Sequence, residues 1–263
     1  MKKIVVLVLF CWISNIWGQN KKATVTKINF VLNTSDHFLG YDSFGFFYTL
    51  TNNVFTKVAQ NETLEYKNIS LGKVTNVDLQ NPLKIVLFYE DFNTVVILDN
   101  QLNESQKINF SETTIPVLAT AIGIASQNQL WVYNSLNQQI GLFDYLNKEY
   151  KTISIPLTTP VLSYTSDFNT FDWLDSLNNW YSCDIFGKIT NKGNFSGYDQ
   201  IQVVNSNEIL IQDNTHLMLY ELRSGKKTEI EILEKTFKKC YYKDQILSIF
   251  TAEGITNYKI IIP

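Results

Sequence analysis

The 263-residue chain has few of the residues that build catalytic and metal sites. It contains two histidines, three cysteines, 11 glycines and five prolines. Zinc sites use several His or Cys ligands at characteristic spacings, and calcium loops follow an Asp-x-Asp-x-Asp-Gly pattern. Neither pattern occurs, nor does a Gly-x-Ser-x-Gly nucleophile motif or a phosphate-binding glycine loop. The sequence therefore predicts no metal site, no cofactor and no catalytic residue.

The histidines and cysteines that are present have structural explanations. His37 in "TSDHFLG" and His216 in "NTHLMLY" stand far apart without further ligands nearby, which indicates ordinary structural or surface histidines. Cys183 in "WYSCDIF" and Cys240 in "KKCYYKD" lie inside apolar runs, which favours buried free thiols. A disulfide between them is the alternative in an oxidising compartment.

Clustered positive charge is also missing, and only one apolar run is long. The formal net charge is −3, and without a basic block nothing indicates nucleic-acid binding. The run from Ile4 to Ile13 follows Lys2 and Lys3, as in a secretory signal peptide, which we expect to span residues 1–18. An uncleaved anchor is the alternative, although a membrane helix takes about 20 residues. We therefore expect a periplasmic or secreted protein with no membrane span after signal removal.

Helical periodicity is scarce in the rest of the chain. Hardly a window repeats apolar residues at i, i+3, i+4 and i+7. Instead, runs of five to eight apolar or aromatic residues alternate with turns rich in Asn, Asp, Ser and Gly. The sequence predicts an all-β protein.

The turns recur at a nearly constant interval of about 40 residues. "NSLN" at 134–137 and "DSLN" at 175–178 are two of six such turns. The six lie at residues 51–53, 90–93, 134–137, 175–178, 213–215 and 251–254. Each joins two apolar runs, so the interval indicates a repeated unit.

Each unit reads as four strands. The first three are apolar throughout, whereas the fourth alternates, as in "TEIEI" (228–232) and "KTISI" (151–155), where Ile153 and Ile155 are expected on one face. Sheets stacked between similar sheets bury both faces of their inner strands, while the outermost strand stays partly wet. Radial stacking of such units is a β-propeller. Two β-sandwiches or one irregular barrel are the alternatives.

The predicted fold is a single six-bladed β-propeller domain, residues 19–263, with four antiparallel strands per blade. The last unit lacks a fourth strand, and the strand at 23–32 lacks a sheet. We therefore expect the strand at 23–32 to complete the last blade and close the ring. The expected blades are 35–70, 73–112, 115–156, 160–195, 198–233, and 236–263 with 23–32.

Aromatic and acidic residues near the turns divide into packing residues and candidates for binding. Trp131 and Phe143 are expected to pack between blades, because flat side chains fill the space between twisted sheets. Phe92 and Tyr145 sit within turns and are the predicted binding residues, since interfaces favour aromatic side chains. The acidic turn residues are expected to serve local backbone hydrogen bonds; they are Asp91, Asp99, Asp144, Asp175 and Asp213.

Strings such as "LWVYNSLNQQIGLFD" and "TVVILDNQLNE" resemble the blades of secreted NHL/YVTN-type propellers. The Asn-rich chain with its Lys-Lys signal also looks like envelope proteins of the Bacteroidota, among them the plug subunit of the type 9 secretion translocon. The resemblance implies a non-catalytic envelope propeller that binds a protein partner, as an interaction module or a subunit of an envelope or secretion complex. A hydrolase, a lyase or a glycan-binding module with its site at the central channel is the alternative.

Overall fold

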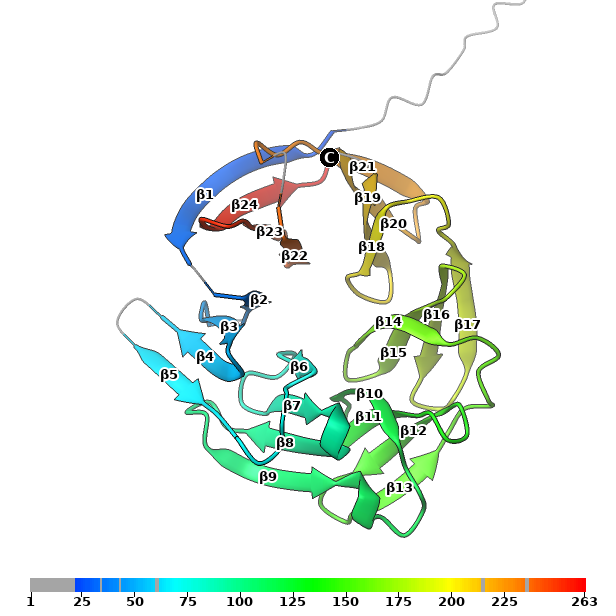
Figure 1. Cartoon of the computed structure of the whole chain (residues 1–263). Coiled ribbons are helices and arrows are strands. Elements are labelled where there is room, and N and C mark those ends of the chain that lie inside the picture. The colour runs from blue at the N-terminus through cyan, green and yellow to red at the C-terminus, as the bar shows by residue number, and fades with distance from the viewer. Residues whose placement is uncertain (1–21, 34, 43, 60–61, 214–215, 235–236) are drawn as a thin grey trace, which may run out of the picture.

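The computed structural model describes residues 22–263 except 34, 43, 60–61, 214–215 and 235–236. The expected signal peptide, residues 1–18, lies outside the described residues. Twenty-four strands form six four-stranded antiparallel sheets arranged in a ring, which confirms the six-bladed β-propeller (Figure 1). In the described part of the chain the helical elements are two 3₁₀ turns, η1 (Glu90–Phe92) and η2 (Phe110–Glu112), and no helix there has the length and apolarity to cross a membrane.

Each sheet lies within the interval expected for its blade. In blades 1 to 5 the strands pair in chain order from the channel outwards, whereas in blade 6 the N-terminal strand takes the outermost place. Blade 1 consists of β2 His37–Tyr41, β3 Phe47–Thr51, β4 Val54–Val58 and β5 Thr63–Tyr66. Blade 2 consists of β6 Asn76–Asp78, β7 Ile85–Tyr89, β8 Thr94–Leu98 and β9 Glu104–Asn109. Blade 3 consists of β10 Ala119–Ile124, β11 Gln129–Asn134, β12 Gln139–Asp144 and β13 Glu149–Thr152.

The remaining blades repeat this order. Blade 4 consists of β14 Val161–Ser166, β15 Thr170–Asp175, β16 Asn179–Asp184 and β17 Ile189–Asn194. Blade 5 consists of β18 Gln200–Val203, β19 Glu208–Asp213, β20 His216–Glu221 and β21 Lys226–Ile230. Blade 6 consists of β22 Lys239–Lys243, β23 Ile246–Phe250, β24 Gly254–Ile261 and β1 Thr24–Leu32.

The N-terminal strand closes the ring as predicted. β1 pairs antiparallel with β24, from Thr24 opposite Ile261 to Leu32 opposite Gly254, with an irregularity between Lys27 and Asn29. Just before β1, the backbone N–H of Ala23 donates a hydrogen bond of 2.8 Å to the carbonyl of Glu229 in β21. The N-terminal segment therefore contacts blade 5, completes blade 6 and leads directly into blade 1 (Figure 1).

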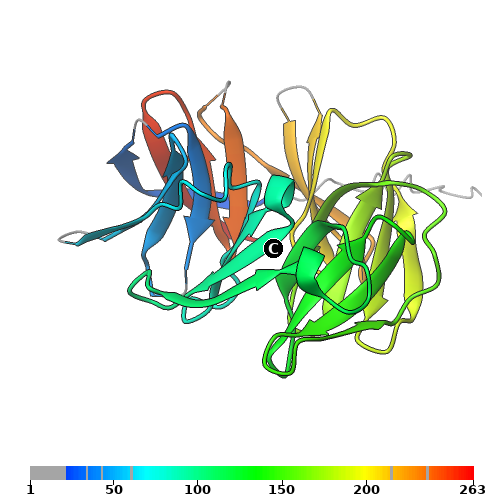
Figure 2. The same cartoon turned by 60° about the horizontal axis from the view of Figure 1, so that its bottom comes forward.

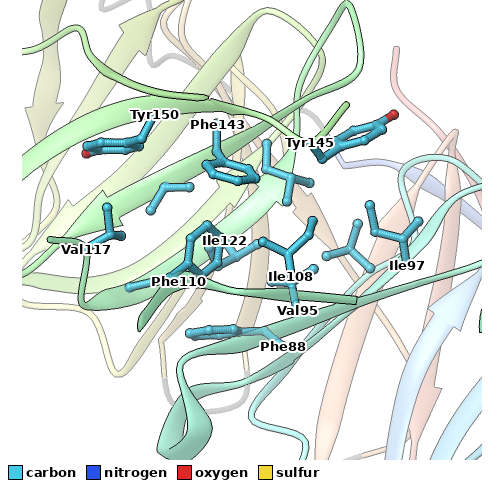
Figure 3. Packing of buried hydrophobic residues seen from close by; sticks show 14 of the residues in the cluster. Phe88, Val95, Ile97, Ile108, Phe110, Val117, Ile122, Phe143, Tyr145 and Tyr150 are labelled. Atoms are coloured by element: carbon cyan, nitrogen blue, oxygen red, sulfur yellow. The ribbon is translucent and has the colours of Figure 1, made fainter. Parts of the chain in front are cut away.

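Six apolar clusters, one at each blade interface, hold the ring together. Alternate residues of one strand serve opposite interfaces: Val86 and Phe88 of β7 pack towards blade 3, whereas Ile85 and Leu87 pack towards blade 1. Figure 3 shows the cluster between blades 2 and 3. This two-sided burial explains the continuous apolar runs in the sequence.

Two specific sequence predictions can be compared with this packing. Trp131 is fully buried between blades 3 and 4, and Phe143 is buried between blades 2 and 3, so both predictions are confirmed. The prediction for "KTISI" was wrong, because β13 is Glu149–Thr152 and Tyr150 supplies its buried side chain. Ile155 follows the strand and is 72% exposed, since the chain has already turned towards the next blade.

Asparagine side chains at two of the periodic turns join neighbouring blades. Asn93, which is left-handed at φ 47°, donates from Nδ2 to the carbonyl of Val117 (2.7 Å) and accepts from the N–H of Ala119 (3.0 Å). Asn53, at φ 62°, likewise donates to the carbonyl of Gly72 and accepts from Val74 N–H. Each amide therefore satisfies two backbone groups where the chain enters the next blade.

Replacing Asn93 with glycine should destabilise the fold by about 1–3 kcal/mol, because two buried backbone groups lose their partners. Glycine keeps the left-handed backbone conformation, so the loss reports the side-chain amide. The matched control is Asn52→Gly, since Asn52 is also left-handed (φ 49°) but exposed. Denaturant unfolding would measure both variants, and equal losses would show that the amide contributes nothing.

Candidate functional site

The alternation of strand direction gives the ring two distinct faces. On one face the chain passes from blade to blade, and the turns between the second and third strands lie there too; we call it the crossover face. On the opposite face each innermost strand turns into the second strand of its blade; we call it the channel face. In the tilted view of Figure 2 the strands run between these two faces.

The two predicted binding residues lie on opposite faces. Phe92 follows β7 in η1, on the crossover face, and is 50% exposed. Tyr145 follows β12, on the channel face, and is only 6% exposed. The structure therefore does not bring them together, and of the two only Phe92 is available for contact. Its role in binding stays a prediction.

Tyr145 has a packing role instead. Its ring belongs to the cluster between blades 2 and 3 (Figure 3). Its hydroxyl accepts a hydrogen bond of 2.8 Å from Nζ of Lys84 in blade 2 and donates one of 3.1 Å to Oδ1 of Asn128 in blade 3. Tyr145 therefore connects the two blades.

All six innermost strands line a polar cavity of about 560 Å³ at the channel face. Leu39 of β2, Ile122 of β10 and Val203 of β18 form part of its wall, together with residues of β6, β14 and β22. Five carboxylates and one lysine also line it: Asp78, Asp167, Asp172, Glu208, Asp244 and Lys243. The cavity is therefore strongly acidic.

Asp78 and Tyr164 connect three blades inside the channel. Oδ2 of Asp78 accepts a hydrogen bond of 2.7 Å from the N–H of Ile124 in blade 3. The hydroxyl of Tyr164 in blade 4 accepts hydrogen bonds from Asn76 in blade 2 and from the N–H of Ile122 in blade 3. Burial raises the pKa of the Asp78 carboxyl, and the backbone hydrogen bonds oppose this shift. This network fixes one side of the cavity.

Asp172 lines the cavity without full hydrogen bonding. It is 1% exposed, and its Oδ2 accepts from the Thr170 hydroxyl at 2.8 Å. Its buried Oδ1 accepts no hydrogen bond of normal geometry, although the Ser182 hydroxyl lies near. Burial is the main reason that the pKa of Asp172 lies above its ordinary value of 3.8. A buried, incompletely paired carboxylate costs stability unless the fold or a ligand compensates it.

The other candidate side chains lie outside the lining of this cavity. Nδ1 of His216 lies 2.9 Å from Oε1 of Glu229 on blade 5, and His37 begins β2 in blade 1. Cys183 is a buried free thiol, as predicted, and burial raises its pKa to about 12. Cys240 is also free but only partly buried. The described residues contain no group of three or more His, Cys, Asp or Glu that could hold a metal ion.

The acidic turn residues mostly behave as expected. Oδ1 of Asp144 accepts hydrogen bonds from the N–H groups of Leu146 and Asn147. Oδ1 of Asp99 and Oδ1 of Asp175 each accept from the N–H groups two and four residues further along the chain. These hydrogen bonds lower the pKa of Asp99 and Asp144. For these three aspartates the local structural role is confirmed.

The crossover face of blades 2 to 4 carries large exposed apolar side chains. We call this group the apolar patch; its members, 44–64% exposed, are Phe92, Ile115, Leu118, Leu136, Leu162 and Leu177. Backbone hydrogen bonds from Ser135 to Leu118 and from Ser176 to Pro160 hold the contributing segments side by side. Of these residues the sequence predicted only Phe92 as a binding residue. It missed Ile115 and the leucines, because single aliphatic residues in turns carry no recognisable pattern.

Charges of both signs lie around the apolar patch. Its connecting segments contain Glu90, Asp91 and Glu112. The segment that enters blade 2 carries Lys73 next to Gly72, where an added Cβ would lie 3.0 Å from the ring of Phe92. The segments are residues 90–93, 110–118, 135–138, 153–160 and 176–178. An exposed apolar group with a polar border is typical of a protein-binding surface.

The fold is shared with many solved bacterial β-propellers. A member of the DUF4221 family from Bacteroides vulgatus superposes with a TM-score of 0.62 at 8% identity, over 92% of this chain and 99% of that one. Virginiamycin B lyase from Staphylococcus aureus gives 0.59 at 12% identity, over 86% and 80%. The extracellular domain of the one-component system BT4673 from Bacteroides thetaiotaomicron gives 0.51 at 12% identity, over 90% and 40%.

These similarities show the propeller fold and nothing finer, because all identities are low. No protein-family model matches the chain, and a sequence search of the curated proteins finds no match. The NHL/YVTN resemblance therefore stays a prediction from the sequence.

Replacing Gly123 with alanine should disrupt the channel network. An added Cβ would lie 1.9 Å from Oγ of Ser166 and 3.2 Å from Oδ2 of Asp78. Overpacking of this kind costs about 1–3 kcal/mol, which thermal unfolding would detect. The additional change Ser166→Gly removes the clashing atoms and should restore part of the loss. An unchanged melting temperature in Gly123→Ala would contradict the described packing.

Replacing Asp172 with asparagine should stabilise the protein at pH 7. In the folded chain the raised pKa of Asp172 keeps its proton bound at pH values where the unfolded chain has lost it. Folding stability therefore falls as the pH rises above 3.8, and asparagine lacks this penalty. We expect a melting temperature about 2–4 °C higher at pH 7, as for about 1 kcal/mol.

The advantage of Asp172→Asn should disappear as the pH falls towards 3.8, where the wild-type carboxyl is protonated. Melting curves from pH 4 to pH 8 would measure this. A stability difference that does not change with pH would show that the charge of Asp172 is not its cause.

Proposed function

We propose that this protein is a non-catalytic envelope β-propeller that binds a protein partner through the apolar patch on its crossover face. The observation that carries the proposal is the gathering of Phe92 and five aliphatic side chains on one face of three adjacent blades. Buried in an interface, each large apolar side chain contributes up to about 1.5–3 kcal/mol. The partner binds a surface that is already exposed, so the fold need not change on binding.

The border of the patch is polar and carries both signs of charge. Glu90 and Asp91 stand beside Phe92, and so does Lys73, which follows Gly72. Complementary charge steers association and excludes wrong partners. The partner therefore presents an apolar surface with a polar border.

The expected export of the chain agrees with an envelope location. The N-terminal sequence predicts a signal peptide, and the same fold serves as an extracellular domain in BT4673. The resemblance to the plug of the type 9 translocon suggests a subunit of a secretion complex as the partner. Binding to a secretion complex is the more specific version of the proposal.

The second candidate function is a hydrolase or lyase with its site in the channel. The observation in its favour is the acidic cavity, in which burial raises the pKa of both Asp78 and Asp172. A raised carboxyl pKa suits a general acid, and virginiamycin B lyase shares the fold. The apolar patch plays no part in this alternative.

The test is a pull-down from the native envelope in mild detergent, followed by mass spectrometry. The double variant Leu136→Lys/Leu177→Lys adds positive charge to the apolar patch. We expect it to lose the partner that the wild type recovers, because it removes apolar contact and places two unpaired charges in the interface.

The matched control is Leu83→Lys on the channel face, because Leu83 is 57% exposed and Leu136 is 60% exposed. This control should retain the partner. Recovery of no specific partner, or equal recovery by the patch variant, would refute the proposal.

A further inference from the structure

We propose that a pocket between blades 6 and 1 binds a free α-amino acid with an apolar side chain. We call it the seam pocket; its volume is about 360 Å³, which suits a small ligand. Asp42 and Gly45 of the β2–β3 turn and Asp244 of the β22–β23 turn line it, so it lies at the channel face. The apolar patch lies on the other face, and the inference therefore does not depend on the proposed function.

The alternation of side chains along β22 directs Lys243 towards blade 1. Tyr242 belongs to the apolar cluster between blades 5 and 6. The ring of Tyr241, on the opposite face of the strand, lies 6.1 Å from that of Phe38 in blade 1. Lys243 follows Tyr241 by two residues and therefore shares its face, and both residues line the seam pocket.

A polar network forms the wall of the seam pocket between the two blades. The hydroxyl of Ser248 donates a hydrogen bond of 2.7 Å to Oδ1 of Asn257. Nδ2 of Asn257 donates to Oδ1 of Asn29 and to the hydroxyl of Tyr41, both at 2.8 Å. No acceptor among the described residues takes the proton of Tyr41 itself. Burial raises the pKa of Tyr41, so its hydroxyl keeps that proton and can donate it to a ligand.

The charges in the wall select a ligand that carries both signs. Lys243 and Asp244 line the seam pocket and also border the channel cavity. Within the described part of the chain, neither takes part in a hydrogen bond or an ion pair. Asp42 is already satisfied, because it accepts from two N–H groups of its own turn and from the hydroxyl of Tyr48. One free charge of each sign fits the carboxylate and the ammonium of an amino acid.

The rest of the wall fits an apolar side chain. Ile28 has no partner on β24, because it stands at the irregularity between Lys27 and Asn29. Bulges of this kind redirect a side chain, and Ile28 lines the seam pocket while 51% exposed. Ile246 and the ring of Tyr241 line it as well. A leucine-like or phenylalanine-like side chain would cover this apolar surface, which favours binding.

The experiment is isothermal titration of the purified protein with L-leucine and with L-phenylalanine. We expect the wild type to bind one molecule of either amino acid. Lys243→Gln and Asp244→Asn should each weaken binding about tenfold or more, because each removes the partner of one ligand charge. Asparagine tolerates the left-handed backbone of Asp244, whose φ is 49°. The matched control Lys107→Gln changes an exposed lysine on the outer strand β9 and should leave the affinity unchanged.

Two analogues of leucine test the recognition of both ligand charges. N-acetyl-L-leucine lacks the ammonium and L-leucinamide lacks the carboxylate. Each should bind about tenfold more weakly than L-leucine, because one charged group of the seam pocket then stays unpaired.

Three outcomes would overturn the inference. The first is no binding of L-leucine or L-phenylalanine at millimolar concentration. The second is equal affinity in the wild type, Lys243→Gln, Asp244→Asn and Lys107→Gln. The third is binding of both analogues as tightly as L-leucine, which would indicate an apolar site without charge recognition. Melting curves of each variant without ligand confirm that the comparison concerns folded protein.

Discussion

Apolar contact between neighbouring sheets is the constraint on which the whole molecule depends. No blade has a core of its own, because each sheet is a single layer whose two faces bury against the sheets beside it. Removing one blade would expose two apolar faces. The sheets must therefore surround an axis, and the channel and the two faces of the ring are geometric consequences of this packing.

The fold could be predicted from the sequence because strands buried on both faces give a strong sequence pattern. Runs such as Ile85–Tyr89 are apolar at every position, and the turns between them recur at a fixed interval. Closure by the N-terminal strand followed from counting strands. The error at "KTISI" arose at an outer strand, where partial exposure weakens the pattern and register is poorly specified.

The candidate sites were much harder to predict from the sequence than the fold. Tyr145 stands in a turn like Phe92, yet its ring points into the core, and the sequence does not encode that difference. Asn93 reads as an ordinary turn residue, although it joins two blades. The cavity gathers side chains from strands between β2 and β22, and no local spacing in the sequence reveals such a long-range arrangement. The positions of the turns could be predicted from the sequence, but the directions of the side chains in the turns could not.

The pairing of β1 with β24 has a consequence for how the molecule forms. Its partners, Thr24 and Ile261 at one end, are separated by most of the chain, and contacts of such sequence separation form slowly. During synthesis the first strand has no sheet to join until the residues of β24 have emerged. Closure of the ring is therefore a late step of folding, because it joins the first described strand to the last.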